Sequence, residues 1–190
     1  MKQCIVFLGK TGSGKDTQAD LLCKKYRVEI IRLGDLVRKR AEHDQVVNDQ
    51  IKHGELVKDS IVDGLLKEQI ASLHDDTIFV SDGYPRHLAQ AHTLSEYLHE
   101  ALAELVAVVY FDVSDSDVRL RLQLRSREDD APDAILERLS EFHEFTEPVI
   151  EHFRNQNSEV FIKIDASKSP DEIFMQLEQE LNKKLNLPKK

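Results

Sequence analysis

Short, almost continuously apolar runs alternate with longer amphipathic stretches along this 190-residue chain, and this alternation limits the possible fold most. Four such runs, rich in β-branched and aromatic residues, occupy 4–8, 77–80, 106–113 and 160–164, and a weaker one occupies 28–31. Runs of this kind are typical of strands that are covered on both faces. Alternation of strands with helices predicts an α/β fold with a five-stranded parallel sheet between two helical layers.

Between these runs, apolar residues recur at helical spacing. The stripes comprise Ile61, Leu65, Leu66, Ile70 and Leu73, then Ile135, Leu139, Phe142, Val149 and Phe153, and finally Ile173, Phe174, Leu177 and Leu181. Pro148 interrupts the second stripe and is expected to kink that helix. Ser169 and Pro170 form a start signal for the third. In parallel sheets of this class, ligands bind beyond the carboxyl ends of the strands.

A glycine-rich turn, Gly9-Lys10-Thr11-Gly12-Ser13-Gly14-Lys15, joins the first strand to the first helix. Glycines allow the backbone to turn its N–H groups inward, and the helix N-terminus adds a favourable dipole for phosphate. Lys15 would contact the β- and γ-phosphates. Asp16 stands where this motif usually has Ser or Thr, followed by Thr17. Its negative charge suits a helix N-terminus but opposes phosphate, so its net effect stays open.

The composition excludes several other classes of protein. The net charge of −9 gives no sign of the basic surface that nucleic-acid-binding proteins usually have. A site for anionic nucleotides must therefore concentrate positive charge locally. Cys4 and Cys23 are expected to be free thiols, and the histidines lack metal-ligand spacing, so no zinc site is expected. The apolar run at 4–8 is too short for a membrane span or a secretory segment. We therefore expect a cytoplasmic protein without a membrane or nucleic-acid partner.

The loop resembles that of adenylate kinases and related nucleoside monophosphate kinases, with Asp16 in place of a family glycine. The resemblance continues in Leu33-Gly34-Asp35-Leu36-Val37-Arg38, Gly54-Glu55-Leu56-Val57, and Asp82-Gly83-Tyr84-Pro85-Arg86 followed by Gln90. Segments around Phe111, Thr146 and Ile164 also match the family. Ordered motifs over most of the chain are far more specific than the loop alone. The resemblance implies one P-loop kinase domain over 1–190, with a core of 1–32, 64–125 and 134–190. It implies a monophosphate-binding insert at 33–63 and a very short lid at 126–133.

The resemblance also assigns roles to residues. It implies ATP binding by Gly9, Gly12, Ser13, Gly14, Lys15, Asp16, Thr17, Arg121, Arg125 and Lys168. It implies AMP binding by Leu33, Gly34, Arg38, Val57, Gly83, Arg86, Gln90, Arg127 and Arg138. Catalysis is expected from Lys15, Arg86, Arg125, Arg127 and Arg138. Mg²⁺ is expected near Asp82, through water, with Thr17 as a second candidate ligand.

The sequence supports parts of these assignments physically. Asp82 ends the third strand beside the loop, and guanidinium groups such as those of Arg38 and Arg86 bind phosphate oxygens in a bidentate fork. Asp35 is a candidate N-cap for the helix that carries Arg38. Only Ser126 separates Arg125 from Arg127, so the sequence does not decide which of the two acts.

The predicted reaction is Mg²⁺-dependent in-line transfer of a phosphoryl group from ATP to AMP, giving two ADP, by a monomer. Gln90 favours adenine as the acceptor base, whereas Leu33 replaces the threonine usual in adenylate kinases. A UMP/CMP or broad-specificity kinase is therefore an alternative, as is a nucleotide-binding sensor without catalysis. A GTPase is disfavoured because we find no NKxD-like guanine motif.

Overall fold

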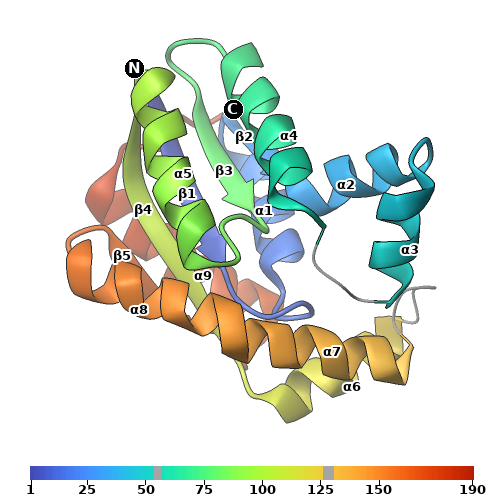
Figure 1. The fold of residues 1–190 in the computed structure, drawn as a ribbon. Helices are drawn as coiled ribbons and strands as arrows, with labels where there is room; N and C mark the ends of the chain where they lie inside the picture. Colours follow the sequence, from blue (N-terminus) through green and yellow to red (C-terminus); the bar gives the residue numbers. More distant parts are fainter. Residues whose placement is uncertain (54–56, 126–130) are drawn as a thin grey trace.

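The computed structural model describes residues 1–53, 57–125 and 131–190 (Figure 1). Its sheet contains β1 (Lys2–Leu8), β2 (Val28–Arg32), β3 (Ile78–Asp82), β4 (Ala103–Asp112) and β5 (Phe161–Asp165). The strands lie side by side in the order β2-β3-β1-β4-β5, and all four pairings are parallel. The predicted five-stranded parallel α/β fold is therefore confirmed.

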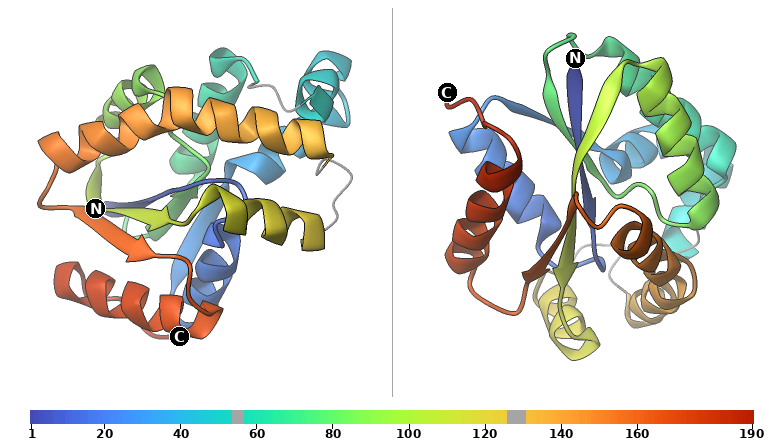
Figure 2. Two further views of the ribbon diagram at one scale, coloured as in Figure 1. Left: turned by 90° about the horizontal axis from the view of Figure 1, so that it is seen from below. Right: turned by 90° about the vertical axis from the view of Figure 1, so that its left-hand side faces the viewer.

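Helices cover both faces of the sheet, as Figure 2 shows in its right-hand view. On one face, α1 (Lys15–Lys25) and α9 (Pro170–Lys184) bury Leu22 and Leu177 against Ile5 and Phe7. On the other face lie α4 (Asp59–Ser72), α5 (Leu88–Glu100) and α8 (Glu147–Gln156). Successive β1 side chains enter opposite cores because strand side chains alternate, which explains why the strands are apolar throughout.

Two short helices follow β2 and project from the sheet edge, α2 (Leu33–Ala41) and α3 (Gln45–His53) (Figure 1). The prediction that Asp35 caps α2 is wrong. The cap position is Arg32, the last residue of β2, so the strand passes directly into the helix. Asp35 lies in the first turn, where a negative charge also favours the helix dipole, and it accepts a hydrogen bond from Arg38 at 2.5 Å.

The remaining helices reach over the carboxyl ends of β1 and β4, namely α6 (Asp115–Arg125) and α7 (Pro132–Glu141). A π-helical turn, Phe142–Thr146, joins α7 to α8, which has Pro148 in its first turn. The predicted interruption of this helix is thus a widened turn just before the proline, which cannot donate a backbone hydrogen bond.

Two further predictions are confirmed. The side chain of Ser169 accepts a hydrogen bond from the Glu172 backbone and so caps α9. Both cysteines are free, with Cys4 fully buried. No helix among the described residues is long and apolar enough to cross a bilayer.

Candidate functional site

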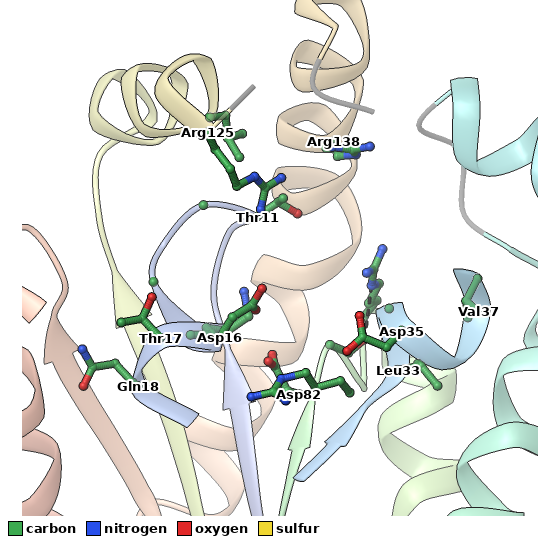
Figure 3. A pocket seen from close by; sticks show the side chains of 18 of the residues that line it. Thr11, Asp16, Thr17, Gln18, Leu33, Asp35, Val37, Asp82, Arg125 and Arg138 are labelled. Carbon is green, nitrogen blue, oxygen red and sulfur yellow. Dashed lines mark hydrogen bonds between the residues drawn. The ribbon is translucent and has the colours of Figure 1, made fainter. Parts of the chain in front are cut away.

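A pocket of about 750 Å³ opens at the carboxyl ends of β2 and β3 (Figure 3). The loop between β1 and α1 forms one wall, and α2 with the residues after β3 forms another. Side chains from α6 and α7 also line it. This is where a parallel α/β sheet is expected to bind ligands.

The glycine-rich loop has the backbone that the sequence requires. Gly9, Gly12 and Gly14 all have positive φ angles, of 148°, 85° and 98°. At Gly12, glycine is also required for steric reasons, because a Cβ atom would lie 2.9 Å from the Cγ atom of buried Leu122. Gly14 occupies the N-cap position of α1, so the N-terminus of that helix faces the pocket.

Lys15 carries the central charge of the loop. Its Nζ atom donates hydrogen bonds to the carbonyl oxygens of Gly9 at 2.8 Å and Lys10 at 3.0 Å. The side chain is buried, and burial lowers the pKa of Lys15, although the carboxylates of Asp82 and Asp16 raise it in part. A partly desolvated ammonium group attracts phosphate more strongly than an exposed one does.

A second charge on the loop, Lys10, anchors it to the neighbouring elements. Its Nζ atom lies 2.6 Å from the Oδ1 atom of Asp115 and donates to the Val113 carbonyl at 2.9 Å. Asp115 also lies 2.9 Å from the Nε2 atom of His143, whose Nδ1 atom is 2.9 Å from Glu147. These two carboxylates raise the pKa of His143. The network connects the loop to α6 and to the helix turn that follows α7.

Asp82 lies at the end of β3, buried, beside the loop. Burial raises its pKa from the ordinary 3.8 to about 6, with Lys15 opposing the change and a hydrogen bond to Asp16 adding to it. Figure 3 shows Asp16 and Asp82 next to each other at the base of the pocket. Two carboxylates in contact are a pair that a bound cation would stabilise.

This donor set fits Mg²⁺ bound together with phosphates. Mg²⁺ commonly uses one or two carboxylates, several waters and substrate phosphate oxygens. Asp82, Asp16 and Thr17 offer such oxygen ligands at the phosphate loop. Among the described residues, no group of three or more histidine, cysteine, aspartate or glutamate side chains could hold a metal ion on its own.

One end of the pocket combines apolar side chains with cations. Val37, Ile51, Val57 and Val62 line it, and Gln90 provides a buried polar group. Its cations are Arg38 on α2 and Arg86 after β3, whose Nε atom donates to the Gly83 carbonyl at 3.2 Å. An apolar slot with one amide group and adjacent guanidinium groups suits a base attached to a phosphate.

The other end is built around α6. Arg121 donates to the carbonyl oxygens of Ser13 at 3.3 Å and Ala166 at 2.8 Å, and so ties the phosphate loop to the segment after β5. Lys168 lines the pocket from that same segment, while Arg125 and Arg138 line it from α6 and α7. Arg138 also lies within electrostatic range of Arg86. Cations from four separate segments therefore converge on one space.

The structure brings most of the predicted site residues together. Those lining the main pocket are Gly12, Gly14, Lys15, Asp16, Thr17, Leu33, Gly34, Arg38, Val57, Asp82, Gly83, Arg86, Gln90, Arg121, Arg125, Arg138 and Lys168. Gly9 lines a smaller adjoining cavity of about 60 Å³ instead, and Ser13, within the loop, is fully buried. Arg127 and most of the predicted lid, as well as 54–56, lie outside the described residues.

Sequence reasoning missed Arg32, which lines the pocket at the end of β2 and pairs with Asp20 on α1. The available signal was its place directly after the weak apolar run at 28–31. It also missed Asp59 and His87, which contact Gln90 without lining the pocket. Their proximity depends on packing of α4 against α5, which no motif in the chain encodes.

Comparison with known proteins gives a consistent result. The sequence model of the family described as adenylate kinase matches residues 7–158. An adenylate kinase of Oenococcus oeni is 32% identical over 185 residues, which cover 94% of this chain and 97% of the relative. One of Prochlorococcus marinus (strain MIT 9301) is 34% identical over 185 residues, covering 95% of this chain and all of the relative. Adenylate kinase 1 of Schistosoma mansoni is 38% identical over 188 residues, with coverages of 94% and 92%.

Proposed function

Because this chain belongs to the adenylate kinase family, we propose how the residues of its pocket divide the work of phosphoryl transfer. The chain is an ATP-dependent nucleoside monophosphate kinase of the adenylate kinase type. The assignment of roles rests on one observation. A single pocket holds a phosphate loop at one end and an apolar slot with arginines at the other.

ATP would lie with its phosphates along the loop, where the backbone N–H groups and Lys15 bind them. Arg121 and Lys168 would flank its base, because both lie beside the segment after β5. Mg²⁺ would be held through water by Asp82, with Asp16 and Thr17 adjacent, and would supply neutralisation of phosphate charge. The expected need for Mg²⁺ rests on the fit of these oxygen ligands.

AMP would place its base in the apolar slot against Gln90 and its phosphate between Arg38 and Arg86. The two phosphates would then meet near Lys15, Arg125 and Arg138, which would neutralise charge on the transferring group. No general base is needed, because the acceptor is already an anionic phosphate. Catalysis by positioning and charge is the general pattern for phosphoryl transfer.

Three further features belong to this proposal. We take 33–63 as the monophosphate-binding insert and 126–133 as the short lid, with the rest as the core. Closure of both parts over bound nucleotides would exclude water and limit hydrolysis of ATP. The expected working state is a monomer in the cytoplasm.

An acceptor panel tests the proposal directly. The purified chain is incubated with Mg²⁺, ATP and AMP, UMP or CMP in turn, and diphosphates are measured by chromatography. AMP should give equal rates of loss of ATP and AMP, with two ADP formed per event. Faster turnover with UMP or CMP would overturn AMP as the preferred acceptor, and nucleotide binding without turnover would favour a sensor.

A further inference from the structure

We infer that Asp59 and His87 are positioning residues that fix the side-chain amide of Gln90 in one orientation. The acceptor pocket would therefore distinguish a base with an amino group, such as adenine, from the matching oxo base, hypoxanthine. This inference rests on the proposed function, because it concerns the base of the acceptor nucleotide.

Gln90 is held on both sides of its amide. Its side chain is buried, and its Oε1 atom accepts a hydrogen bond from the backbone N–H of Arg86 at 2.8 Å. Its Nε2 atom donates to the Oδ1 atom of Asp59, also at 2.8 Å. The Arg86 backbone is held on its other side as well, since the Arg86 carbonyl accepts a hydrogen bond from the Thr146 hydroxyl at 2.8 Å.

These partners exclude the opposite amide orientation on chemical grounds. A backbone N–H can only donate and a carboxylate can only accept. Rotating the Gln90 amide by half a turn would place its NH₂ group against the Arg86 N–H and its oxygen against the Asp59 carboxylate. Both contacts would then be repulsive and both bonds would be lost. The cost falls mainly on the Gln90 amide, which is buried, whereas the Asp59 carboxylate is about half exposed.

His87 holds the Asp59 carboxylate in place. The His87 Nδ1 atom accepts a hydrogen bond from the Gln90 backbone N–H at 3.4 Å and so caps α5. With Nδ1 acting as acceptor, the neutral ring carries its hydrogen on Nε2, which lies 2.8 Å from Asp59 Oδ1. A closed ring of three residues, Asp59, His87 and Gln90, therefore connects the first turns of α4 and α5.

The fixed amide keeps one N–H and one oxygen lone pair unused on Gln90. Adenine offers an amino donor beside a ring-nitrogen acceptor, which matches that pattern. Hypoxanthine offers an oxo acceptor beside a ring N–H donor, which is the reverse. A freely rotating glutamine could turn its amide to suit either base, whereas this one cannot. The same logic favours cytosine over uracil.

The test is the ratio of kcat/KM for AMP to that for IMP, which differ in this donor–acceptor pair. In Asp59→Ala the amide loses the partner that opposes rotation, and we expect the AMP:IMP ratio to fall about tenfold. The change should appear as a higher KM for AMP and a lower KM for IMP, with little change in the KM for ATP. A general loss of structure would not lower the KM for IMP.

Glu68→Gln is the matched control, because it also removes one carboxylate from α4, at an exposed position outside the pocket. It should retain the wild-type ratio. His87→Asn keeps an N-cap residue on α5 but releases Asp59, and should lower the ratio by a smaller factor. This variant also provides the test if Asp59→Ala fails to fold, as judged by circular dichroism.

The outcomes separate the two proposals. If the wild-type chain does not phosphorylate AMP, the proposed function fails. If the wild-type chain prefers AMP to IMP but Asp59→Ala and His87→Asn retain that preference within twofold, the function stands and the fixed amide is wrong. A fall in the ratio for both variants, with Glu68→Gln unchanged, supports the inference.

Discussion

Replacing Asp82 with asparagine should stabilise the nucleotide-free chain at high pH while impairing its activity. The carboxyl group is buried, and its pKa is raised from 3.8 to about 6. Because the folded state binds this proton more tightly than the unfolded state, the group favours folding at low pH. That contribution is lost as pH rises through about 6.

The size of the effect follows from these two values. At 1.36 kcal/mol per pKa unit, ionised Asp82 lowers the free energy of unfolding by about 3 kcal/mol at pH 8. At pH 5, ionisation of Asp82 lowers the free energy of unfolding by about half of that amount. Asparagine carries no charge at either pH and can still donate a hydrogen bond to Asp16. The variant should therefore exceed the wild type in stability by about 3 kcal/mol at pH 8 and by about half as much at pH 5.

The assay is urea unfolding monitored by circular dichroism at both pH values, with EDTA and no nucleotide. Asp76→Asn serves as the control, since it removes a carboxylate from the exposed turn before β3 and should show no comparable gain. Turnover with ATP and AMP should fall in Asp82→Asn, in line with its proposed place beside Mg²⁺. A variant less stable than the wild type at pH 8, or a gap that does not depend on pH, would refute the reasoning.

Three other predictions follow from the same structure. Lys15→Met should lower kcat/KM on the order of 10³-fold or more, and unchanged diphosphate synthesis in a coupled assay would contradict its role. Gly12→Ala should destabilise the chain by roughly 1–3 kcal/mol in thermal melts, since the φ of Gly12 is +85° and Leu122 blocks the new methyl group. The control is Gly64→Ala on α4, where the new methyl group enters open space and should stabilise the chain by about 0.5–1 kcal/mol. His143→Gln should reduce stability most below pH 6.5, because Asp115 and Glu147 raise the pKa of His143. The loss of stability relative to the wild type should shrink by pH 9, as the wild-type ring loses its charge. A loss that grows with pH in the same melts would argue against this ion pair.

The strands of this fold are predicted well from the sequence because helices cover the sheet on both faces. A parallel strand buried on both faces must be apolar along its length, so the runs at 4–8 and 160–164 differ from β1 and β5 by at most two residues at either end. The same reasoning placed Asp82 at the end of β3.

One wrong prediction and one missed residue show the limits of local signals. Asp35 looked like a helix cap because an acidic residue is favoured both at the cap and in the first turn, and the chain uses the second option. Arg32 and Asp82 face one pocket because β2 lies beside β3, although α2, α3 and α4 separate the strands in sequence. Strand order is set by packing of distant elements, which local periodicity does not record.

The two hydrogen bonds from Lys15 to the carbonyls of its own loop have a consequence for repeated turnover. An ammonium group has three hydrogens, so one is left for a phosphate oxygen after these two are used. If both carbonyl bonds are kept when a nucleotide binds, its arrival and departure would alter a single bond of the amine and leave the curvature of the turn unchanged. The loop would then receive the next nucleotide without the loss of entropy that ordering a flexible segment brings.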